Sequence, residues 1–589
     1  MHSYIKEISI SNYRSFRQCC TIPLGNLTAL VGYNNAGKSN ILNALEWLIT
    51  NGSLAENDFS CQDLPIEIVA EIVNVDEAVL QRLGTTHRRK IETFVFEEKV
   101  KIKRIQSVPG DKSTNNKFWL WDENAQDWRH NPAGIDAAMK KLFPDVIRIN
   151  AMEDAASDAS KAKSTSTIGK LLKLISGELI ERHQNDVDET LGQVRNSLSA
   201  EGSDRFDGLK NIDTKINESI GMFFPRVSVK LDVPVPSLEE LLGSGTIKIY
   251  EDDSIEGRAI NYYGHGSQRS VQMALIKLLA DMRSTAGDSF TAQLILIDEP
   301  ELYLHPFAIE VLMDAFKALS EDGYQVAYST HSAQMISRES CGSTILVRKN
   351  AENGTFIRKP LSYVINDVVD KPEHCKEIIY SLSCASQIFF SEKVIVTEGK
   401  TEKRVLPEIY RFMTGSSMGV NHIGLASLNG KDIYPKAQKI FSLLDMPAKF
   451  VADLDFAFAL ASRGEILEKE DPDYLALLVL LEELKSEGEI GLDDKGHPKN
   501  KKAPCAAEEA YRKLVAKEGA GQHINSIHEK LIENNIWVWP KGTIEDHIGN
   551  ESKNELGLLK YVGRLKDSGV DEVCPDPHGV RRFINWIDA

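Results

Sequence analysis

The sequence predicts an α/β protein with two consecutive parts, and two features carry this prediction. In the first part, a glycine-containing loop lies between a short apolar strand and an apolar-periodic helix, which is the setting of a phosphate-binding loop. In the second part, from about residue 390, apolar strands alternate with helices and carboxylates follow the strands. Strands separated by helices form parallel sheets, whose ligands bind at the carboxyl ends of the strands.

Length, charge and cysteine usage narrow the class of protein. The 589 residues exceed what one hydrophobic core can organise, so roughly two to four domains are expected. A net charge of −17 gives no general basic surface for nucleic acid, although it leaves room for a local basic groove. The sequence shows no apolar signal segment and no run of roughly 18 apolar residues, so we expect a cytoplasmic protein without membrane contact. The eight cysteines form no CxxC pair, which favours free thiols over a zinc site.

The phosphate-binding loop is the most specific motif in the first part. The apolar strand Leu27–Val31 precedes a G-x-x-x-x-G-K-S sequence, and a helix follows it. Backbone N–H groups of such a loop face the phosphates of ATP, its lysine reaches the β and γ oxygens, and its serine hydroxyl binds Mg²⁺. The expected nucleotide-binding residues are Gly32, Asn34, Asn35, Ala36, Gly37, Lys38, Ser39 and Asn40, with Ser39 also a metal ligand.

A second strand with a carboxylate end completes the expected ATPase site. Leu294–Ile297 lead into Asp298, which would hold the Mg²⁺ shell, and Glu299, which would polarise the attacking water. About thirty residues further on, His331 ends another strand, where it could sense the γ-phosphate. Order and spacing carry this assignment, because a lone histidine is usually structural.

A turn upstream of this strand resembles a signature element. Gly264, Gly266, Ser267 and Gln268 open an amphipathic helix, whose N-terminus could close over the γ-phosphate of a second subunit. Together, these elements resemble the ABC-type ATPase heads of the SMC, Rad50 and RecF group, and the resemblance implies a dimer that sandwiches two ATP molecules. Arg14 is then a candidate phosphate contact, and Gln62 is either a Q-loop glutamine or a plain surface residue.

Residues 151–225 replace the long coiled-coil arms of SMC and Rad50. Their apolar residues recur at helical spacing, which predicts one or two polar amphipathic helices. These helices either pair two subunits, which we favour, or cover one subunit as a lid. The following segment, FFPRVSVKLDVPVPSLEELL, alternates in polarity and is expected to return as strand to the ATPase sheet.

Carboxylates mark the strand ends of the second part. Val394–Thr397 run into Glu398, and Glu402 lies one helical turn further on. Phe450, Val451 and Ala452 run into Asp453 and Asp455, whose side chains point the same way because strand side chains alternate with period two. Such a pair repels itself at neutral pH unless a cation lies between the carboxylates.

A third strand, IWVW, leads into Gly542 and Glu545. Glu398 followed by Asp453 and Asp455 gives the order E…DxD after successive strands, which resembles a toprim domain. Clustered oxygen ligands without Cys or His suit Mg²⁺ or Mn²⁺. One or two such ions support in-line displacement at phosphorus. The sequence therefore predicts a phosphodiester-cutting site in this part.

An ABC-type head followed by a toprim domain resembles the OLD (overcoming lysogenisation defect) nucleases over nearly the whole chain. The VGYNNAGKSN loop is similar to the phage-encoded branch of that family. The resemblance implies an ATP-hydrolysing, metal-dependent DNA endonuclease that acts in anti-phage defence or phage–phage exclusion. It also implies that Glu398, Glu402, Asp453 and Asp455 hold a first metal and Glu545 a second. The expected division is 1–150 and 226–385 for the ATPase, 151–225 for a dimerising helical insertion and 386–589 for the toprim domain.

The sequence departs from the family at one site and leaves the basic residues open. Thr543 stands where relatives often carry aspartate, so a second metal would bind loosely or through water. The candidates for a lysine that assists the metals are Lys541, Lys560 and Lys566. The candidates for contacts with a DNA backbone are Lys495, Lys499, Lys501 and Lys502, with HRRK at 87–90 as a weaker one.

Two other readings of the function compete with the nuclease. A RecF-like ATP-dependent DNA clamp would keep the toprim fold as a passive module, but an idle site has no reason to hold converging carboxylates. A primase would need nucleotide-handling residues that the sequence does not show. For a nuclease, the partners could include a helicase or a retron reverse transcriptase with its single-stranded DNA. The residues do not favour one of these partners over the other. They also do not show whether ATP activates or restrains DNA cutting.

Overall fold

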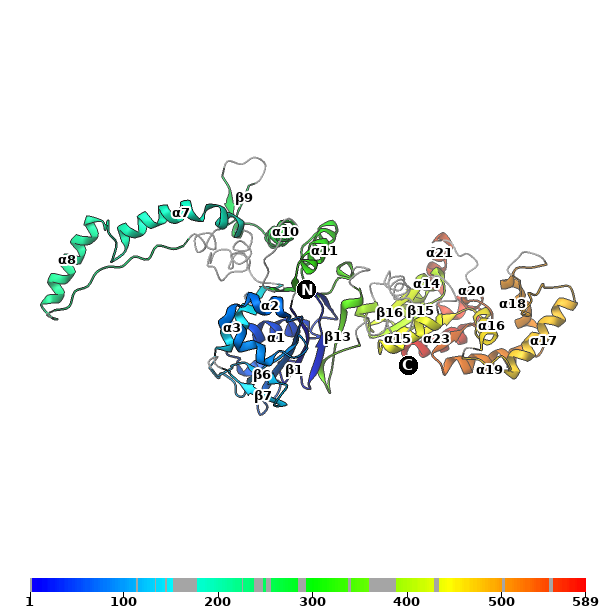
Figure 1. The fold of residues 1–589 in the computed structure, drawn as a ribbon. Coiled ribbons are helices and arrows are strands. Elements are labelled where there is room, and N and C mark those ends of the chain that lie inside the picture. Colours follow the sequence, from blue (N-terminus) through cyan, green and yellow to red (C-terminus); the bar gives the residue numbers. More distant parts are fainter. Residues whose placement is uncertain are drawn as a thin grey trace. The chain divides into compact units, whose positions relative to one another are not determined.

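The computed structural model describes the chain in two compact units (Figure 1). The residues described are 3–112, 115–132, 134–142, 146–151, 177–224, 226–237, 247–250, 256–283, 293–336, 341–359, 388–427, 434–464, 466–499, 504–549 and 555–589. The N-terminal unit comprises Met1–Leu30, Asn34–Met335 and Val347–Phe356. The C-terminal unit comprises Val31–Tyr33, Ile336–Leu346 and Ile357–Ala589. None of the described helices is long and apolar enough to cross a membrane.

An antiparallel sheet that the sequence interpretation did not anticipate forms part of the N-terminal unit. Its strands, in spatial order, are β2 (Cys20–Pro23), β1 (Tyr4–Ser11), β4 (Ile66–Val73), β5 (Val100–Gln106), β6 (Trp119–Asp122) and β7 (Asp127–His130). One face is buried because apolar residues recur with period two, as Ile66, Ile68, Ala70 and Ile72 do in β4. The helices α2 (Glu77–Arg82), α3 (Gly84–Ile91) and α4 (Ile135–Leu142) belong to this region.

The second sheet of this unit carries the nucleotide motifs. Its order is β14 (Gly354–Ile357), β13 (Thr344–Asn350), β3 (Leu27–Val31), β12 (Tyr324–Thr330), β11 (Gln293–Asp298) and β8 (Val146–Ile149). β11 is parallel to both β12 and β8. The predicted strands at 27–31 and 294–297 are confirmed. The remaining helices of this part are α1 (Lys38–Thr50), α10 (His265–Arg283) and α11 (Pro306–Glu321).

The described part of the insertion is helical, as predicted, but the segment after it is not strand. The helices are α7 (Gly177–Leu198) and α8 (Asp207–Gly221), and residues 152–176 lie outside the described part. Residues 226–237 form no strand. Asn217 and Asp213 of α8 hold this segment instead, because they hydrogen-bond the backbone of Val229 and Leu231. Side chains of a helix thus replace a neighbouring strand, which an alternating pattern alone cannot reveal.

The C-terminal unit contains the small parallel sheet that the sequence predicts. Its order is β16 (Ile423–Ser427), β15 (Lys393–Thr397), β17 (Ala448–Ala452) and β18 (Ile536–Val538), and all three pairings are parallel. The surrounding helices are α14 (Lys400–Thr414), α15 (Tyr434–Leu443), α16 (Asp455–Arg463), α20 (Ile544–Ile548), α21 (Glu555–Ser568), α22 (Val570–Val573) and α23 (Pro577–Asp588). The side chains of Trp537, Trp539 and Phe583 pack in its core.

A segment of three further helices between β17 and β18 was not expected from the sequence. It consists of α17 (Pro472–Ser486), α18 (Ala507–Ala516) and α19 (Ala520–Ile532). Asp471 caps α17 by accepting hydrogen bonds from its first backbone N–H groups. Lys530 of α19 lies 2.7 Å from Asp471 and 2.8 Å from Asp473, which fixes α19 against the start of α17. The short 3₁₀ segments of the chain are Glu56–Asp58, Glu92–Phe94, Ile260–Tyr262, Ala333–Met335, Cys341–Ser343 and Ile388–Phe390.

Arg205 is expected to hold residues 226–237 against α8. Its guanidinium pairs with Asp213 at 2.9 Å and donates to the carbonyl oxygens of Leu198, Ser199 and Leu231. Arg205→Ala should therefore raise the rate of limited proteolysis within residues 199–237 by roughly an order of magnitude, because local opening sets the cleavage rate. Lys210→Ala, which removes an exposed pair with Asp207, serves as the control. Equal cleavage of both variants would contradict this role.

Candidate functional sites

The phosphate-binding loop is held in shape from β14. Gly37 has a φ of +107°, and a Cβ added there would lie 2.2 Å from Oγ1 of Thr355, so only glycine fits. The hydroxyl of Thr355 donates to the carbonyl oxygen of Ala36 at 2.8 Å and lies 2.7 Å from Oγ of Ser15. Asn40 donates to the same Ser15 hydroxyl at 2.7 Å. Ala36 in the second half of the loop and Asn40 directly after it are therefore tied to one hydrogen-bonded group.

The residues expected around the nucleotide-bound metal lie together. Oγ of Ser39 donates to Oδ1 of Asp298 at 2.9 Å, and Ser329 donates to the same oxygen. Arg148 of β8 contacts the other oxygen of Asp298 at 2.8 Å and also donates to Asn43 of α1. The sequence interpretation missed Arg148, because its only signal is a charged residue in an otherwise buried strand.

Lys38, Glu299 and His331 also meet in the structure. Nε2 of His331 lies 2.9 Å from Nζ of Lys38 and 3.0 Å from Oε1 of Glu299. Burial lowers the pKa of Lys38 to about 8, although the nearby carboxylates of Glu299 and Asp298 act to raise it. Burial and the charge of Lys38 lower the pKa of His331. The candidate base, sensor and phosphate-binding lysine thus form one connected group.

Two further residues that the sequence interpretation missed support this group. Glu299 has a φ of +45°, an unusual backbone conformation for a non-glycine residue. Arg269 of α10 donates to the carbonyl oxygens of Asp298 and Glu299, at 2.7 Å and 2.9 Å, and holds this turn. Glu301 accepts hydrogen bonds from Thr330 and from the backbone of His331, and burial raises its pKa. The signal for Arg269 was its place directly after the signature-like turn.

The remaining predicted nucleotide contacts are placed unevenly. Helix α10 begins at His265, so Gly266, Ser267 and Gln268 form its first turn rather than a turn before it. Ser267 is exposed and Gly266 is half-buried, whereas Gln268 is buried and donates to the carbonyl oxygen of Tyr263. That inward position does not suit a contact with a second subunit.

Four other candidates in this unit lie at the surface. Asn34 and Asn35 are exposed. Arg14 pairs with Asp58 at 2.8 Å and reaches Asn40 at 3.4 Å. Gln62 is exposed and donates to Glu56, as expected of the surface alternative. These residues carry less of the site than Lys38 and Ser39 do.

The carboxylates of the C-terminal unit converge around Asp453. Glu398 directly follows β15, Asp453 and Asp455 follow β17, and Glu545 lies in α20 after β18. Burial raises the pKa of Asp453 well above its usual range, and the negative charges of Glu402, Glu398, Asp455 and Glu545 raise it further. The structure therefore brings together all five carboxylates that the sequence singled out.

Glu402 is folded back against the start of its own helix. A Cβ at Gly399 would lie 2.9 Å from Oε2 of Glu402, so the glycine leaves room for the carboxylate. Burial raises the pKa of Glu402 to about 7. Its own backbone N–H and that of Gly399 oppose this rise, whereas the charges of Glu545 and Glu398 add to it. Glu402 is thus a carboxylate that changes its protonation near neutral pH.

Thr543, the position at which the sequence resemblance led us to expect a weak metal ligand, has a structural role. It is the N-cap of α20, and its hydroxyl and backbone N–H both donate to Asp546 at 2.9 Å. Asp546 in turn pairs with Arg512 at 2.6 Å. Gly542 has a φ of +122°, which allows the turn that starts this cap. The side chain of Thr543 is therefore committed to the helix start rather than offered to a metal.

The basic candidates differ in their surroundings. Nζ of Lys541 lies 3.6 Å from Asp576, whereas Lys560 and Lys566 are exposed on α21. Lys495 and Lys499 flank a turn that Asp493 stabilises. Lys501 and Lys502 lie outside the described residues. Of the HRRK segment, Arg88 pairs with Glu77 and Glu92.

The donor set of the carboxylate cluster fits a hard divalent cation. All five side chains offer oxygen, and their charges raise the pKa of Asp453, a repulsion that a divalent cation would relieve. Within the described residues, no three or more His, Cys, Asp or Glu side chains are already arranged to hold an ion.

The fold and the two sites define a P-loop ATPase joined to a toprim domain. A family model described as "AAA domain, putative AbiEii toxin, Type IV TA system" matches residues 27–337. A second model, "Overcoming lysogenization defect protein-like, TOPRIM domain", matches residues 389–455. The chain belongs to the OLD nuclease family, and it is an ATPase and a metal-dependent endonuclease that uses a nucleotide and a divalent metal.

Named relatives agree with this assignment along most of the chain. The Old nuclease of Escherichia phage P2 is 35% identical over 589 residues, which cover 99% of this chain and 98% of the relative. Endonuclease GajA of Bacillus cereus (strain HuB5-5) is 20% identical and covers 93% of this chain and 83% of its own. A solved SMC head bound to the C-terminal winged-helix domain of ScpA covers 62% of this chain and 99% of its own, at 16% identity, but its TM-score of 0.36 is too low to support an argument.

Thr355→Val is expected to weaken ATP binding, because it removes the hydroxyl that holds the Ala36 carbonyl while keeping the side-chain volume. The loss of one such hydrogen bond costs about 1 kcal/mol, so the KM for ATP should rise about fivefold. Thr355→Ser keeps the hydroxyl and should restore most of the affinity. Equal KM values for the valine and serine variants would contradict this role.

Metal binding is expected to depend on pH through Glu402. Its folded-state pKa of about 7 lies above the ordinary 4.5, so the metal-free fold loses stability as the pH rises from 4.5 to 7. A cation that binds the ionised carboxylate offsets this loss. The rise in Tm on adding Mg²⁺ or Mn²⁺ to protein in EDTA-treated buffer should therefore be larger at pH 8 than at pH 6.

Glu402→Gln provides the control for that measurement. The amide cannot ionise, so the metal-free variant should be more stable than the unsubstituted protein at pH 8, and its metal-induced shift should be small at both values. A metal-induced rise in Tm that is the same at pH 6 and pH 8 would refute the role of Glu402.

Proposed function

We propose that this chain is an ATP-regulated DNA endonuclease whose cutting site is the carboxylate cluster. In this proposal Glu398, Glu402, Asp453 and Asp455 hold a Mg²⁺ or Mn²⁺ ion, and Glu545 supports a second. The observation that carries the proposal is the convergence of four carboxylates on Asp453, a residue whose pKa is raised well above its usual range first by burial and then by these negative charges. A bound divalent ion would supply the charge that activates water and stabilises the leaving oxygen at phosphorus.

In this proposal, each residue of the nucleotide site has a separate role in ATP hydrolysis. Lys38 binds the phosphate oxygens, and Ser39 and Asp298 hold the metal of the nucleotide. Glu299 accepts a proton from the attacking water, while His331, 3.0 Å away, orients its carboxylate. Arg269 keeps Glu299 in place through the backbone. The short distances between these side chains support this division of roles.

We propose the domain division 1–150, 151–225, 226–385 and 386–589, with the insertion pairing two subunits. The end of α8 supports the pairing, because Met222, Phe223 and Phe224 are 84%, 77% and 65% exposed. A dimer would place Gly266 and Ser267 of one subunit over the ATP of the other. A helicase, or a retron reverse transcriptase with its single-stranded DNA, is a candidate partner in cytoplasmic anti-phage defence or phage–phage exclusion. Membership in the OLD family weighs against the alternative of a passive clamp.

Cleavage of supercoiled plasmid tests the function directly. With Mg²⁺ or Mn²⁺, the unsubstituted protein should nick the plasmid, and Asp453→Ala should lower the rate at least about a hundredfold, since even outer-shell groups change metal sites by about 10–100-fold. Lys38→Ala should cut at the same rate with and without ATP. The effect of ATP on the unsubstituted protein then shows whether ATP activates or restrains cutting. Asp494→Ala removes an exposed carboxylate of the same unit and is the control.

A failure of the unsubstituted protein has two possible origins that a second assay separates. If plasmid and single-stranded DNA stay intact in both metals, the assay is repeated in lysate from phage-infected cells. Cutting that appears there and depends on Asp453 would show that a partner controls the nuclease. Continued absence of cutting would overturn the proposal in favour of the clamp.

A further inference from the structure

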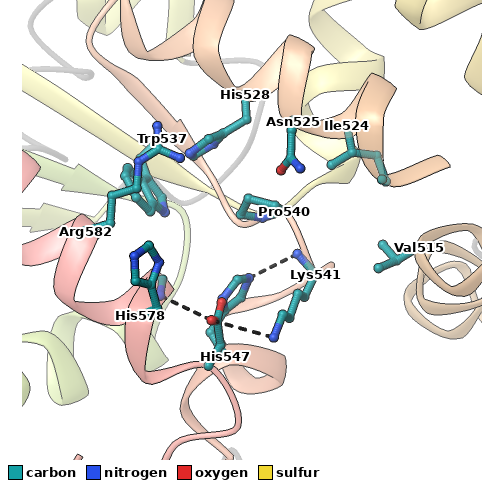
Figure 2. Close-up of a pocket in the computed structure, with 13 residues that line it drawn as sticks. Val515, Ile524, Asn525, His528, Trp537, Pro540, Lys541, His547, His578 and Arg582 are labelled. Atoms are coloured by element: carbon teal, nitrogen blue, oxygen red, sulfur yellow. Dashed lines mark hydrogen bonds and ion pairs between the residues drawn. The ribbon is translucent and has the colours of Figure 1, made fainter. Parts of the chain in front are cut away.

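A pocket on the outer side of β18 is a feature of the C-terminal unit that neither site uses. It has a volume of about 280 Å³ and lies among α19, the end of β18, α20 and the start of α23 (Figure 2). That volume is close to the lower end for small-molecule sites in proteins, about 300–1,000 Å³. The pocket can therefore take a ligand of roughly mononucleotide size.

The pocket adjoins the carboxylate cluster through the turn after β18. Lys541 and His547 line the pocket, and Glu545 lies between them in the sequence. The carbonyl oxygen of Gly542, next to Lys541, accepts a hydrogen bond from the backbone of Leu454 at 2.8 Å. The backbone N–H of Ile544 lies 3.3 Å from Oδ1 of Asp453. A group bound in the pocket thus lies beside the turn that carries the metal-binding candidates.

The lining of the pocket combines cationic and apolar groups. Figure 2 shows Lys541 next to Pro540, and Arg582 with His578 on the other side of the view. The side chain of Lys541 is 46% exposed, whereas the guanidinium of Arg582 is paired with Glu529. Val515, Ile524 and Pro540 are apolar, and the amide of Asn525 lies near Ile524. A phosphate suits Lys541 and a planar base suits the apolar residues, because bases bind apolar surfaces and amides pair with base edges.

His547 and Asp576 hold Lys541 in position. Nδ1 of His547 lies 2.6 Å from Oδ2 of Asp576, and Nε2 accepts a hydrogen bond from the backbone of Lys541 at 3.0 Å. The ammonium group of Lys541 lies 3.6 Å from the same carboxylate. Figure 2 shows these contacts as dashed lines beside the pocket. Lys541 is thus anchored at the backbone while its half-exposed end can still meet a phosphate.

We propose that this pocket binds one nucleotide of the DNA strand that the adjoining carboxylates cut. Its phosphate meets Lys541, and its base lies against Pro540 and Ile524. The inference rests on the proposed nuclease function and adds a substrate subsite to it. A free nucleoside 5′-monophosphate has the same chemistry, so it is the probe that separates binding of a strand from binding of a single nucleotide.

Gly521 allows the pocket to be filled without disturbing the fold. It lines the pocket in the first turn of α19, and a Cβ added there meets no atom within 4 Å. Gly521→Trp should raise the KM for a single-stranded oligonucleotide about tenfold, as expected when one stacked base, worth about 1–3 kcal/mol, is lost. The kcat should fall by much less. Gln522→Trp puts the same indole one residue further along α19, outside the pocket lining, and should leave KM unchanged.

The salt dependence of binding gives a second, independent readout. Lys541→Met should reduce the slope of log Kd against log salt concentration by about 0.7, the value for one phosphate contact with single-stranded DNA. A residue with only a structural role would leave that slope as it is. This variant also keeps the test open if the C-terminal unit of Gly521→Trp does not fold, which limited proteolysis of that unit would show.

The outcomes separate this inference from the nuclease proposal. If the unsubstituted protein does not cut DNA in either metal or in infected-cell lysate, the nuclease proposal fails and this inference fails with it. If it cuts but both Gly521→Trp and Lys541→Met keep its KM and salt slope, only the pocket inference is overturned. Deoxynucleoside 5′-monophosphates should compete with the oligonucleotide in the unsubstituted protein and lose potency in Gly521→Trp. Equal competition in both would also overturn the inference.

Discussion

Repulsion among buried carboxylates is the constraint on which the C-terminal unit depends. Parallel register sets it up, because Thr397 of β15 pairs with Val451 of β17, and Val451 pairs with Trp537 of β18. Strands in such register end at one edge, so the residues that follow them arrive together. Burial raises the pKa of Asp453 well above its usual range, and the negative charges of these neighbours raise it further. A fold that keeps this arrangement must stabilise it elsewhere or bind a cation.

Two glycines and a buried tyrosine hold the carboxylates of the C-terminal unit in position. Gly399 gives Glu402 room to reach the start of its helix, and Gly542 allows the turn before α20. Tyr434, fully buried, donates from its hydroxyl to the carbonyl oxygen of Val451 at 2.7 Å, directly behind Asp453. The pocket beside β18 adjoins the same turn, because His547, held by Asp576, hydrogen-bonds the backbone of Lys541 there. Cluster and pocket therefore share one supporting turn.

The sequence predicted what short-range patterns encode and missed what long-range contacts decide. The strands at 27–31, 294–297, 394–397 and 450–452 follow from apolar runs that end at motifs, and each is found. The strand expected after residue 225 is absent, because Asp213 and Asn217 of α8 bind that backbone instead. Arg148, Arg269 and Thr355 support the nucleotide site from positions far away in the sequence. Their roles arise only when β8, α10 and β14 are folded against it.

The two sites respond differently to the loss of their ligands. At the nucleotide site, Lys38 lies among Asp298, Glu299 and Glu301, so opposite charges remain in contact without ATP. At the carboxylate cluster, the charges that act most strongly on Asp453 are all negative, so their repulsion is relieved by a cation or by protonation. The cluster therefore relies on a bound cation or on a proton for the opposite charge that Lys38 supplies at the nucleotide site. If ATP controls cutting as proposed, it does so at a cluster whose repulsion the proposed metal also relieves.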